Sequence, residues 1–65
     1  MNYVVKYRQD DGKWLVKGFE NDKVSKIFDV KGDAVAHAIY LAKSSGGSYI
    51  MVYSENGTGA EKIGV

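Results

Sequence analysis

Few side chains in this sequence could carry out covalent chemistry. His37 is the only histidine, and there is no cysteine to pair with it. The serines at positions 44, 45, 48 and 54 have no base and third group implied by their spacing. A metal site needs several converging ligands, whereas Asp10-Asp11 and the acids at positions 20 and 22 look like turn residues. We therefore expect no catalytic residue, no metal, no cofactor and no enzymatic activity.

The glycine pairs are not arranged as a phosphate-binding loop. Such a loop places its glycines before a helix, at the positive end of the helix dipole. Gly46 and Gly47 instead follow the predicted helix, where they act as a stop. Lys31 and Gly32 do stand where the helix is expected to begin, but aspartates on both sides would repel an anion. We therefore expect no nucleotide site.

Basic and aromatic side chains offer a different, non-covalent chemistry. The stretch YIMVY, residues 49–53, is apolar or aromatic at every position, although a strand alternates its side chains between two faces. If Ile50 and Val52 face a core, the two tyrosines and Met51 point the other way. Basic residues interleaved with aromatic rings are typical of surfaces that bind single-stranded nucleic acid. An exposed apolar patch equally suits a protein interface, and lysines at solvent-facing strand positions also occur without any function.

Glycine, asparagine and aspartate divide the chain into short segments, and there is no proline. Asp11-Gly12 between two alternating runs predicts a hairpin, and ENGTG, residues 55–59, predicts a later turn. Apolar residues at helical spacing predict one amphipathic helix, with Asp29 or Asp33 as its N-terminal cap. The expected elements are strands at Tyr3–Arg8, Lys13–Phe19, Val24–Phe28, Ser48–Ser54 and Ala60–Val65, and a helix from about Lys31 to Ser45.

One helix of about fifteen residues is roughly 22 Å long, which covers one face of a small sheet and leaves the other open. Alternation assigns the strand residues to these faces, with Phe28 able to turn to either side. We expect a core on the helix side from Tyr3, Val5, Tyr7, Trp14, Val16, Ile27, Ile50, Val52 and Ile63, packed on Ala38 and Leu41. We expect the other face to hold the candidate binding residues Lys6, Arg8, Lys17, Phe19, Lys26, Tyr49, Met51, Tyr53 and Lys62, with Leu15 among them.

Composition sets further limits. The 65 residues fit one small domain, 1–65, of a size that buries only about 60% of its unfolded surface. Without disulfides to help, such a domain often associates, so we expect a homo-oligomer, and Ala36 and Tyr40 on the outer helix side would permit close approach of a second subunit. No apolar stretch approaches the roughly 20 residues of a membrane helix, and the start has no signal-peptide pattern. We expect a soluble, cytoplasmic protein without a membrane partner.

Two segments carry a resemblance to a known family. KWLVKG (residues 13–18) and IFDVKGDAVAHAIYLAKSSGGS (residues 27–48), with the strand and Asn-Gly turn that follow, resemble the small prokaryotic and phage proteins called domain of unknown function 2188. Val30 stands where that family usually has a threonine cap, and Gly32 stands where it usually has an acid. The resemblance implies the fold and a bacterial or phage origin, and it transfers no functional residue. The matching positions are Trp14, Val16, Phe28, Lys31, Ala34, Ala38, Leu41, Ala42 and Gly46.

These observations lead to one fold and two functional hypotheses. We expect an α+β domain in which a single helix packs on a mostly antiparallel sheet of five short strands. The first hypothesis is a non-catalytic module that binds nucleic acid through the basic and aromatic sheet face. The second is that this face mediates self-association or captures a protein partner, as in a phage or bacterial accessory protein.

Overall fold

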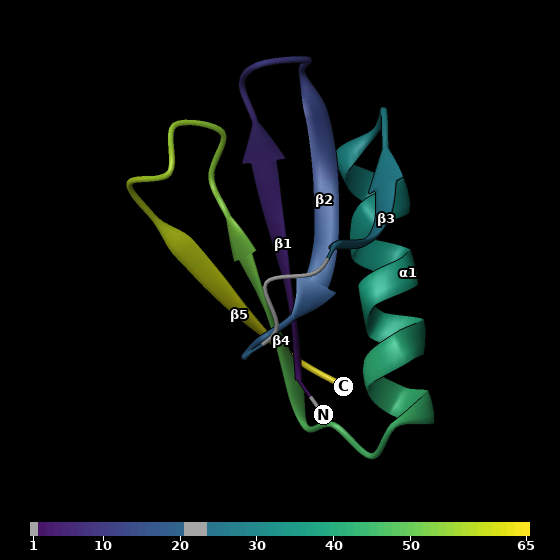
Figure 1. Cartoon of the computed structure of the whole chain (residues 1–65). Coiled ribbons are helices and arrows are strands. Elements are labelled where there is room, and N and C mark those ends of the chain that lie inside the picture. The colour runs from purple at the N-terminus through teal and green to yellow at the C-terminus, as the bar shows by residue number, and fades with distance from the viewer. Residues whose placement is uncertain (1, 21–23) are drawn as a thin grey trace.

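The computed structural model describes residues 2–20 and 24–65. Within them the chain forms three strands, one helix and two further strands, which is the predicted order (Figure 1). The α+β fold expected from the sequence is thereby confirmed. The elements are β1 (Tyr3–Arg8), β2 (Lys13–Gly18), β3 (Val24–Phe28), α1 (Lys31–Ser44), β4 (Tyr49–Tyr53) and β5 (Ala60–Gly64).

The strands form one mixed sheet in the order β3-β2-β1-β4-β5, with β1 at its centre. β1 and β4 run parallel, whereas β1–β2, β2–β3 and β4–β5 are antiparallel pairs. The expectation of a mostly antiparallel sheet therefore holds, with the central β1–β4 pair as the exception. α1 connects β3 to β4 and lies along one side of the sheet, beyond β3 in the view of Figure 1. We call the other side of the sheet the open face, because none of the described helices or strands covers it.

Two glycine turns set the registers of the antiparallel pairs. Gly12 has a φ of 68° and donates its N–H to the carbonyl of Arg8 at 2.9 Å. Gly57 has a φ of 74°, and the side chain of Asn56 accepts the backbone N–H of Thr58 at 3.1 Å. Positive φ angles of this kind are costly for residues with a Cβ. The Asp-Gly and Asn-Gly dipeptides thus turn the chain where the sequence predicts.

The C-terminal end of α1 agrees with the sequence prediction, whereas its N-terminal end does not. At the C-terminus Gly46 has a φ of 75°, and the N–H of Gly47 bonds to the carbonyl of Ala42 at 2.6 Å, which is a Schellman stop at the predicted place. At the N-terminus the cap residue is Val30, and no side chain bonds to the free N–H groups. The expectation that Asp29 or Asp33 caps the helix is therefore wrong, because the chain is still extended at position 30 and becomes helical only after it.

α1 packs on the sheet through a row of small side chains. Ala34, Ala38 and Ala42 are fully buried, so the helix backbone approaches the sheet closely and the large core residues come from the strands. Trp14 is 7% exposed, and its ring centroid lies 4.9 Å from that of Tyr7. The other buried members of this core are Val5, Val16, Ile50 and Val52, with Phe28, Leu41 and Ile63 among the partly buried residues around it.

The placement of β3 differs from the sequence prediction. Phe28 is directly opposite Trp14 in the β2–β3 pair, so it shares the helix side of the sheet, while Ile27 is opposite Leu15 on the open face. Ile27, predicted to be in the core, is 44% exposed. The prediction assumed that the charged Lys26 points away from the helix, and alternation then assigned its neighbour Ile27 to the core. On an edge strand a lysine can lie on the helix side and still reach water.

Candidate binding face

The pairing registers place the open-face side chains in rows across the strands. One row runs from Lys62 on β5 through Met51 on β4 and Val4 on β1 to Lys17 on β2. The next row brings Lys6 opposite Leu15. The candidate residues Lys6, Arg8, Lys17, Tyr49, Met51, Tyr53 and Lys62 thus share one face.

Lys26 and Phe19 differ in position from the other candidates. Lys26 is opposite Val16 and its Nζ lies 5.4 Å from the centroid of the Phe28 ring, so it belongs to the helix side of the sheet and not to the candidate face. Phe19 follows the last residue of β2, and its N–H bonds to the carbonyl of Asn2 at 2.8 Å, which continues the β1–β2 ladder. Phe19 is 50% exposed at this end of the open face.

Val4 is a buried open-face residue that sequence reasoning missed. It is only 4% exposed, although α1 packs on the other side of the sheet. Its neighbours across the sheet are Met51 and Lys17, which have long side chains on the same face. The signal was present in the consecutive valines Val4-Val5 on the central strand, where one of the two must point to each face. The middle of the open face is therefore a packed apolar floor with charged groups around it.

Two lysines of this face lie over tyrosine rings of β4. The Nζ of Lys6 is 5.5 Å from the ring centroid of Tyr53, and the Nζ of Lys62 is 4.4 Å from that of Tyr49. Such cation–π contacts contribute about 0.5–1 kcal/mol at exposed sites. They hold both ammonium groups near β4 without neutralising their charge.

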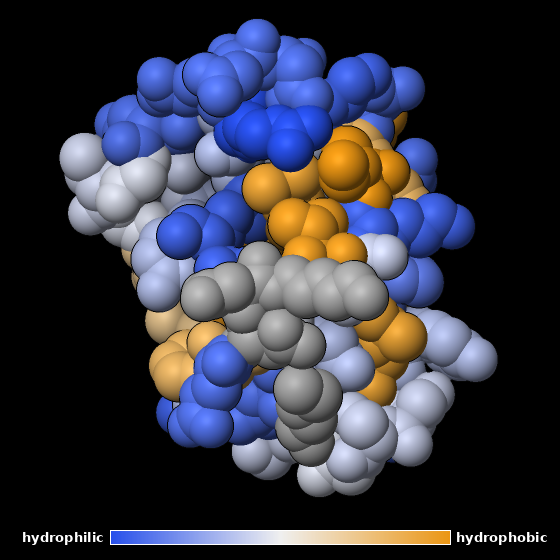
Figure 2. Space-filling model, viewed as in Figure 1, coloured by the Kyte–Doolittle hydropathy of each residue, from blue (hydrophilic) through white to orange (hydrophobic). Residues whose placement is uncertain are grey.

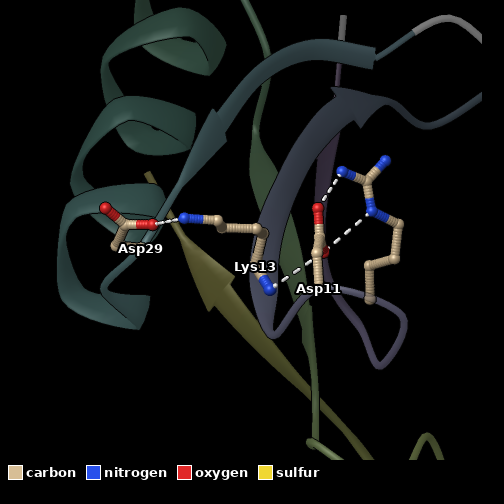
Figure 3. A network of polar contacts seen from close by, with 4 residues as sticks. Asp11, Lys13 and Asp29 are labelled. Carbon is tan, nitrogen blue, oxygen red and sulfur yellow. Dashed lines mark hydrogen bonds and ion pairs between the residues drawn. The ribbon is translucent and has the colours of Figure 1, made fainter.

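Arg8 and Lys13, at one end of the face, have acidic partners (Figure 3). The Arg8 guanidinium donates to both carboxylate oxygens of Asp11, with Nε 3.0 Å from Oδ1, and the Lys13 ammonium pairs with Asp29. The bond from Arg8 lowers the pKa of Asp11 and raises that of Arg8. The bond to Asp29 likewise raises the pKa of Lys13. These two cations are therefore compensated, and Arg8 adds little net charge to the face.

Lys6, Lys17 and Lys62 remain as the uncompensated cations. No ion pair within the described residues involves them, and no acid occupies an open-face position of β1 to β5. Glu61, the acid in β5, is opposite Val52 and so lies on the helix side. We call the three lysines together with Tyr49, Met51 and Tyr53 the lysine–tyrosine surface. It presents one sign of charge although the whole chain has a net charge of only +1.

Beside this surface the open face is apolar. Leu15, Phe19 and Ile27, which we call the apolar strip, come from β2, its end and β3. Figure 2 shows hydrophobic surface in orange over the region of β2 and β3, with hydrophilic residues in blue around it. The open face therefore has lysines on β1, β2 and β5, and apolar residues on β2, at its end and on β3, with Lys17 between Leu15 and Phe19 on β2.

Other places in the structure do not assemble comparable chemistry. Among residues 2–20 and 24–65 no three His, Cys, Asp or Glu residues lie close enough to hold a metal ion. His37 lies between two rings, with centroids 5.3 Å from Phe28 and 6.4 Å from Tyr40. A hollow of about 190 Å³ beside Lys31, Ser54 and Glu61 has no histidine in its lining. For the described part of the chain, no helix has the length and apolar character needed to cross a membrane.

Comparison with known proteins gives one match. A family model described as "Uncharacterized protein conserved in bacteria (DUF2188)" matches residues 3–63, which is nearly the whole chain. No curated protein and no solved structure matches.

Proposed function

We propose that this chain, which belongs to the DUF2188 family, binds single-stranded nucleic acid through the lysine–tyrosine surface, without catalysing a reaction on it. One observation supports this proposal. Three lysines without acidic partners among the described residues lie on one sheet face, and two of them lie over tyrosine rings of β4. Basic groups that follow a phosphate backbone beside stacking rings are the usual components of such sites.

The spacing of the lysines suits a flexible anionic strand. Lys6 and Lys17 are diagonal neighbours on β1 and β2, so their backbones are about 7–8 Å apart. Lys62 is two strands from Lys6 and offset from it by two residues along the strands, or about 12 Å at the usual strand and residue spacings. Long lysine side chains adjust over such separations. We therefore expect the strand to cross the sheet from β5 to β2, with one phosphate near each lysine.

Charge also favours a polyanion over a second copy as the occupant of this surface. Two copies stacked through their lysine–tyrosine surfaces would bring three lysines from each against one another, and the open-face positions of β1 to β5 hold no acid to compensate them. Like charges held together in this way oppose association, whereas phosphates gain from the same arrangement.

A protein partner is the second candidate, and the apolar strip favours it. Phe19 and Ile27 are 50% and 44% exposed. Large apolar side chains that gather on one face often mark an interaction site. This candidate uses a different part of the open face, so it is compatible with nucleic-acid binding at the lysines.

Fluorescence anisotropy with a labelled oligothymidylate across a salt series tests the first proposal. Three phosphate contacts predict a log-log salt slope of about −2, at roughly 0.7 per contact. Lys6→Gln/Lys17→Gln should reduce the magnitude of the slope to about 0.7 and weaken binding at low salt. Lys31→Gln/Lys43→Gln, on α1, changes the net charge equally and should leave the slope near −2.

Tyr53→Leu in the same assay should weaken binding by about 1–3 kcal/mol if the ring stacks on a base. No binding at low salt would refute the proposal. An equal loss of affinity in the two double-lysine variants would show that only net charge matters. Tighter binding of duplex than of single strand would show that the ligand is double-stranded.

A further inference from the structure

The β3 edge of the sheet has features that the lysine–tyrosine surface does not use. β3 pairs with β2 alone among the described strands, so its outer backbone groups are free to pair with another strand. Of the four large hydrophobic residues that the described chain exposes, two belong to β3 or to the turn directly after it. They are Ile27 (44%) and Val30 (55%).

We propose that two copies of the chain associate through their β3 strands, antiparallel and about a two-fold axis, to form one continuous sheet. The occupant of this edge is thus a second copy of the chain. This inference does not depend on nucleic-acid binding, because it uses different residues.

One register of the β3–β3 pair is self-complementary. With Ile27 opposite Ile27 of the second copy, both exposed side chains are buried against each other on the open-face side. Lys26 is then opposite the second copy's Phe28 on the helix side. An ammonium over this ring is a contact that the chain already makes, since the Nζ of Lys26 lies 5.4 Å from the centroid of its own Phe28.

The neighbouring registers are unfavourable. A shift of the two-fold axis by one residue keeps the faces and has two forms. One brings Lys26 opposite Lys26 of the second copy, which places like charges directly against each other, and the other brings Phe28 opposite Phe28 but sets Ile27 against the charged Asp29. The other edge strand, β5, has Glu61 and Lys62 at its centre and none of the large exposed hydrophobic residues. Side-chain complementarity thus selects both the edge and the register.

The helices support the same arrangement. A two-fold axis perpendicular to the joined sheet places both copies of α1 on the same side of it, in an interface that uses the same patch of each copy. His37 lies against Phe28 of β3, with Tyr40 as its next ring neighbour, so this part of α1 is above the joining edge. His37 of each copy is therefore near the joined β3 strands on the helix side.

The arrangement also keeps the uncompensated lysines apart. Lys6 is on β1 and Lys62 is on β5, two and four strands away from the joining edge. Unlike a face-to-face dimer, an edge-to-edge dimer brings no open-face lysine against its copy. Both open faces lie on the same side of the joined sheet and remain accessible.

Cysteine cross-linking tests the register directly, because the chain has no cysteine of its own. In the proposed pair the two Ile27 Cα atoms are about 4.5–5.5 Å apart, which a disulfide can span. Ile27→Cys should therefore form a covalent dimer rapidly under mild oxidation. Phe19→Cys, at a position of similar exposure on the same face, should remain mostly monomeric on denaturing gels.

Sedimentation equilibrium tests the association itself. The natural chain should sediment at twice its 7.1 kDa mass at high micromolar concentration. Ile27→Lys, which places two ammonium groups together, should weaken dimerisation at least tenfold while leaving the circular dichroism spectrum unchanged. Lys6→Gln/Lys17→Gln should not affect the dimer.

A natural chain that stays monomeric at millimolar concentration would overturn the inference. So would a dimer that Ile27→Lys leaves intact, or equal rates of cross-linking for the two cysteine variants. Loss of nucleic-acid binding with an intact β3-linked dimer would refute only the proposed function.

Discussion

Trp14 is the single side chain on which the helix side of the sheet depends most. It is 7% exposed, packs against Tyr7, and has the Nζ of Lys31 at 5.5 Å from its ring centroid. Trp14→Ala should lower the free energy of unfolding by about 3–5 kcal/mol, because it leaves a cavity that the short helix cannot fill. That is a large share of the stability of a small domain.

Urea unfolding followed by circular dichroism measures this effect, with Phe19→Ala as the control. Phe19 is 50% exposed, so its truncation should cost less than about 1 kcal/mol. Similar losses in the two variants would contradict the placement of Trp14 in the core.

The ion pair between Asp11 and Arg8 is a contact that depends on pH. The pKa of Asp11 is lowered in the folded chain, first of all by the hydrogen bond from Arg8. A carboxyl of this kind adds stability above its unfolded pKa, and the contribution is lost as the pH falls through the lower folded pKa. Both side chains of the pair reach solvent, so the contribution to stability is small.

Arg8→Gln should raise the pKa of Asp11 toward its ordinary value. The measurement is an NMR titration of the Asp11 carboxyl carbon in the natural chain and the variant. Lys17→Gln, which removes a cation without a bond to Asp11, is the matched control and should leave the titration nearly unchanged. An unshifted Asp11 pKa in Arg8→Gln would show that the pair does not form in solution.

At the scale of elements, the two ends of α1 respond in opposite ways to the same substitution. Gly46 ends the helix at a φ of 75°, so Gly46→Ala should cost about 1 kcal/mol or more. Gly32 is in the first turn of α1, and an added Cβ there would meet nothing within 4 Å. Gly32→Ala should therefore stabilise the chain by about 0.4–1 kcal/mol, because it restricts the unfolded state.

Thermal unfolding of the two alanine variants beside the natural chain compares these effects. The melting temperature should fall for Gly46→Ala and rise for Gly32→Ala. A rise in both would mean that the helix does not end in the left-handed turn.

The elements also show which parts of the structure the sequence could predict. Alternation assigned β1, β2 and β4 correctly, because each has a row of valines or aromatics on one side. It failed for β3, where Ser25 and Lys26 are both exposed and the charge of Lys26 does not reveal which face it occupies. The face on which each residue of this edge strand lies follows from its pairing with β2, here Trp14 opposite Phe28. The sequence around β3 does not contain that information.

The candidate face was predictable to a similar extent. The positions of Lys6, Lys17 and Lys62 follow from alternation, since their strands have clear apolar faces. The pairing of Arg8 with Asp11 depends on the exact turn geometry, which brings a guanidinium back onto a residue three positions later. The sequence therefore predicted five basic groups on the face. In the structure Arg8 pairs with Asp11 and Lys26 lies on the helix side of the sheet, so three lysines remain on the face without an acidic partner among the described residues.

At the scale of the whole molecule, the core and the proposed binding surface lie on opposite sides of one sheet. The side under α1 contains the buried core, and the open face contains the free lysines, the tyrosines of β4 and the apolar strip. Substitutions at lysines of the open face should thus change binding with little effect on folding. The central strand β1 is the element shared by both sides, since Val5 and Val4 are buried on opposite faces of it.

The parallel pairing of β1 with β4 has a consequence for how the chain folds. During synthesis β1 emerges first, and the hairpin with β2 can form at once, but the other edge of β1 waits for β4, near the end of the chain. Joining Tyr3 to Ile50 closes a loop of most of the sequence, at an entropic cost of about 3 kcal/mol. Until then the nascent sheet exposes a valine-rich edge, which is a template for aggregation. Docking of β4 should therefore be the slow step of folding, and the stage at which a ribosome-bound chain most needs protection by a chaperone.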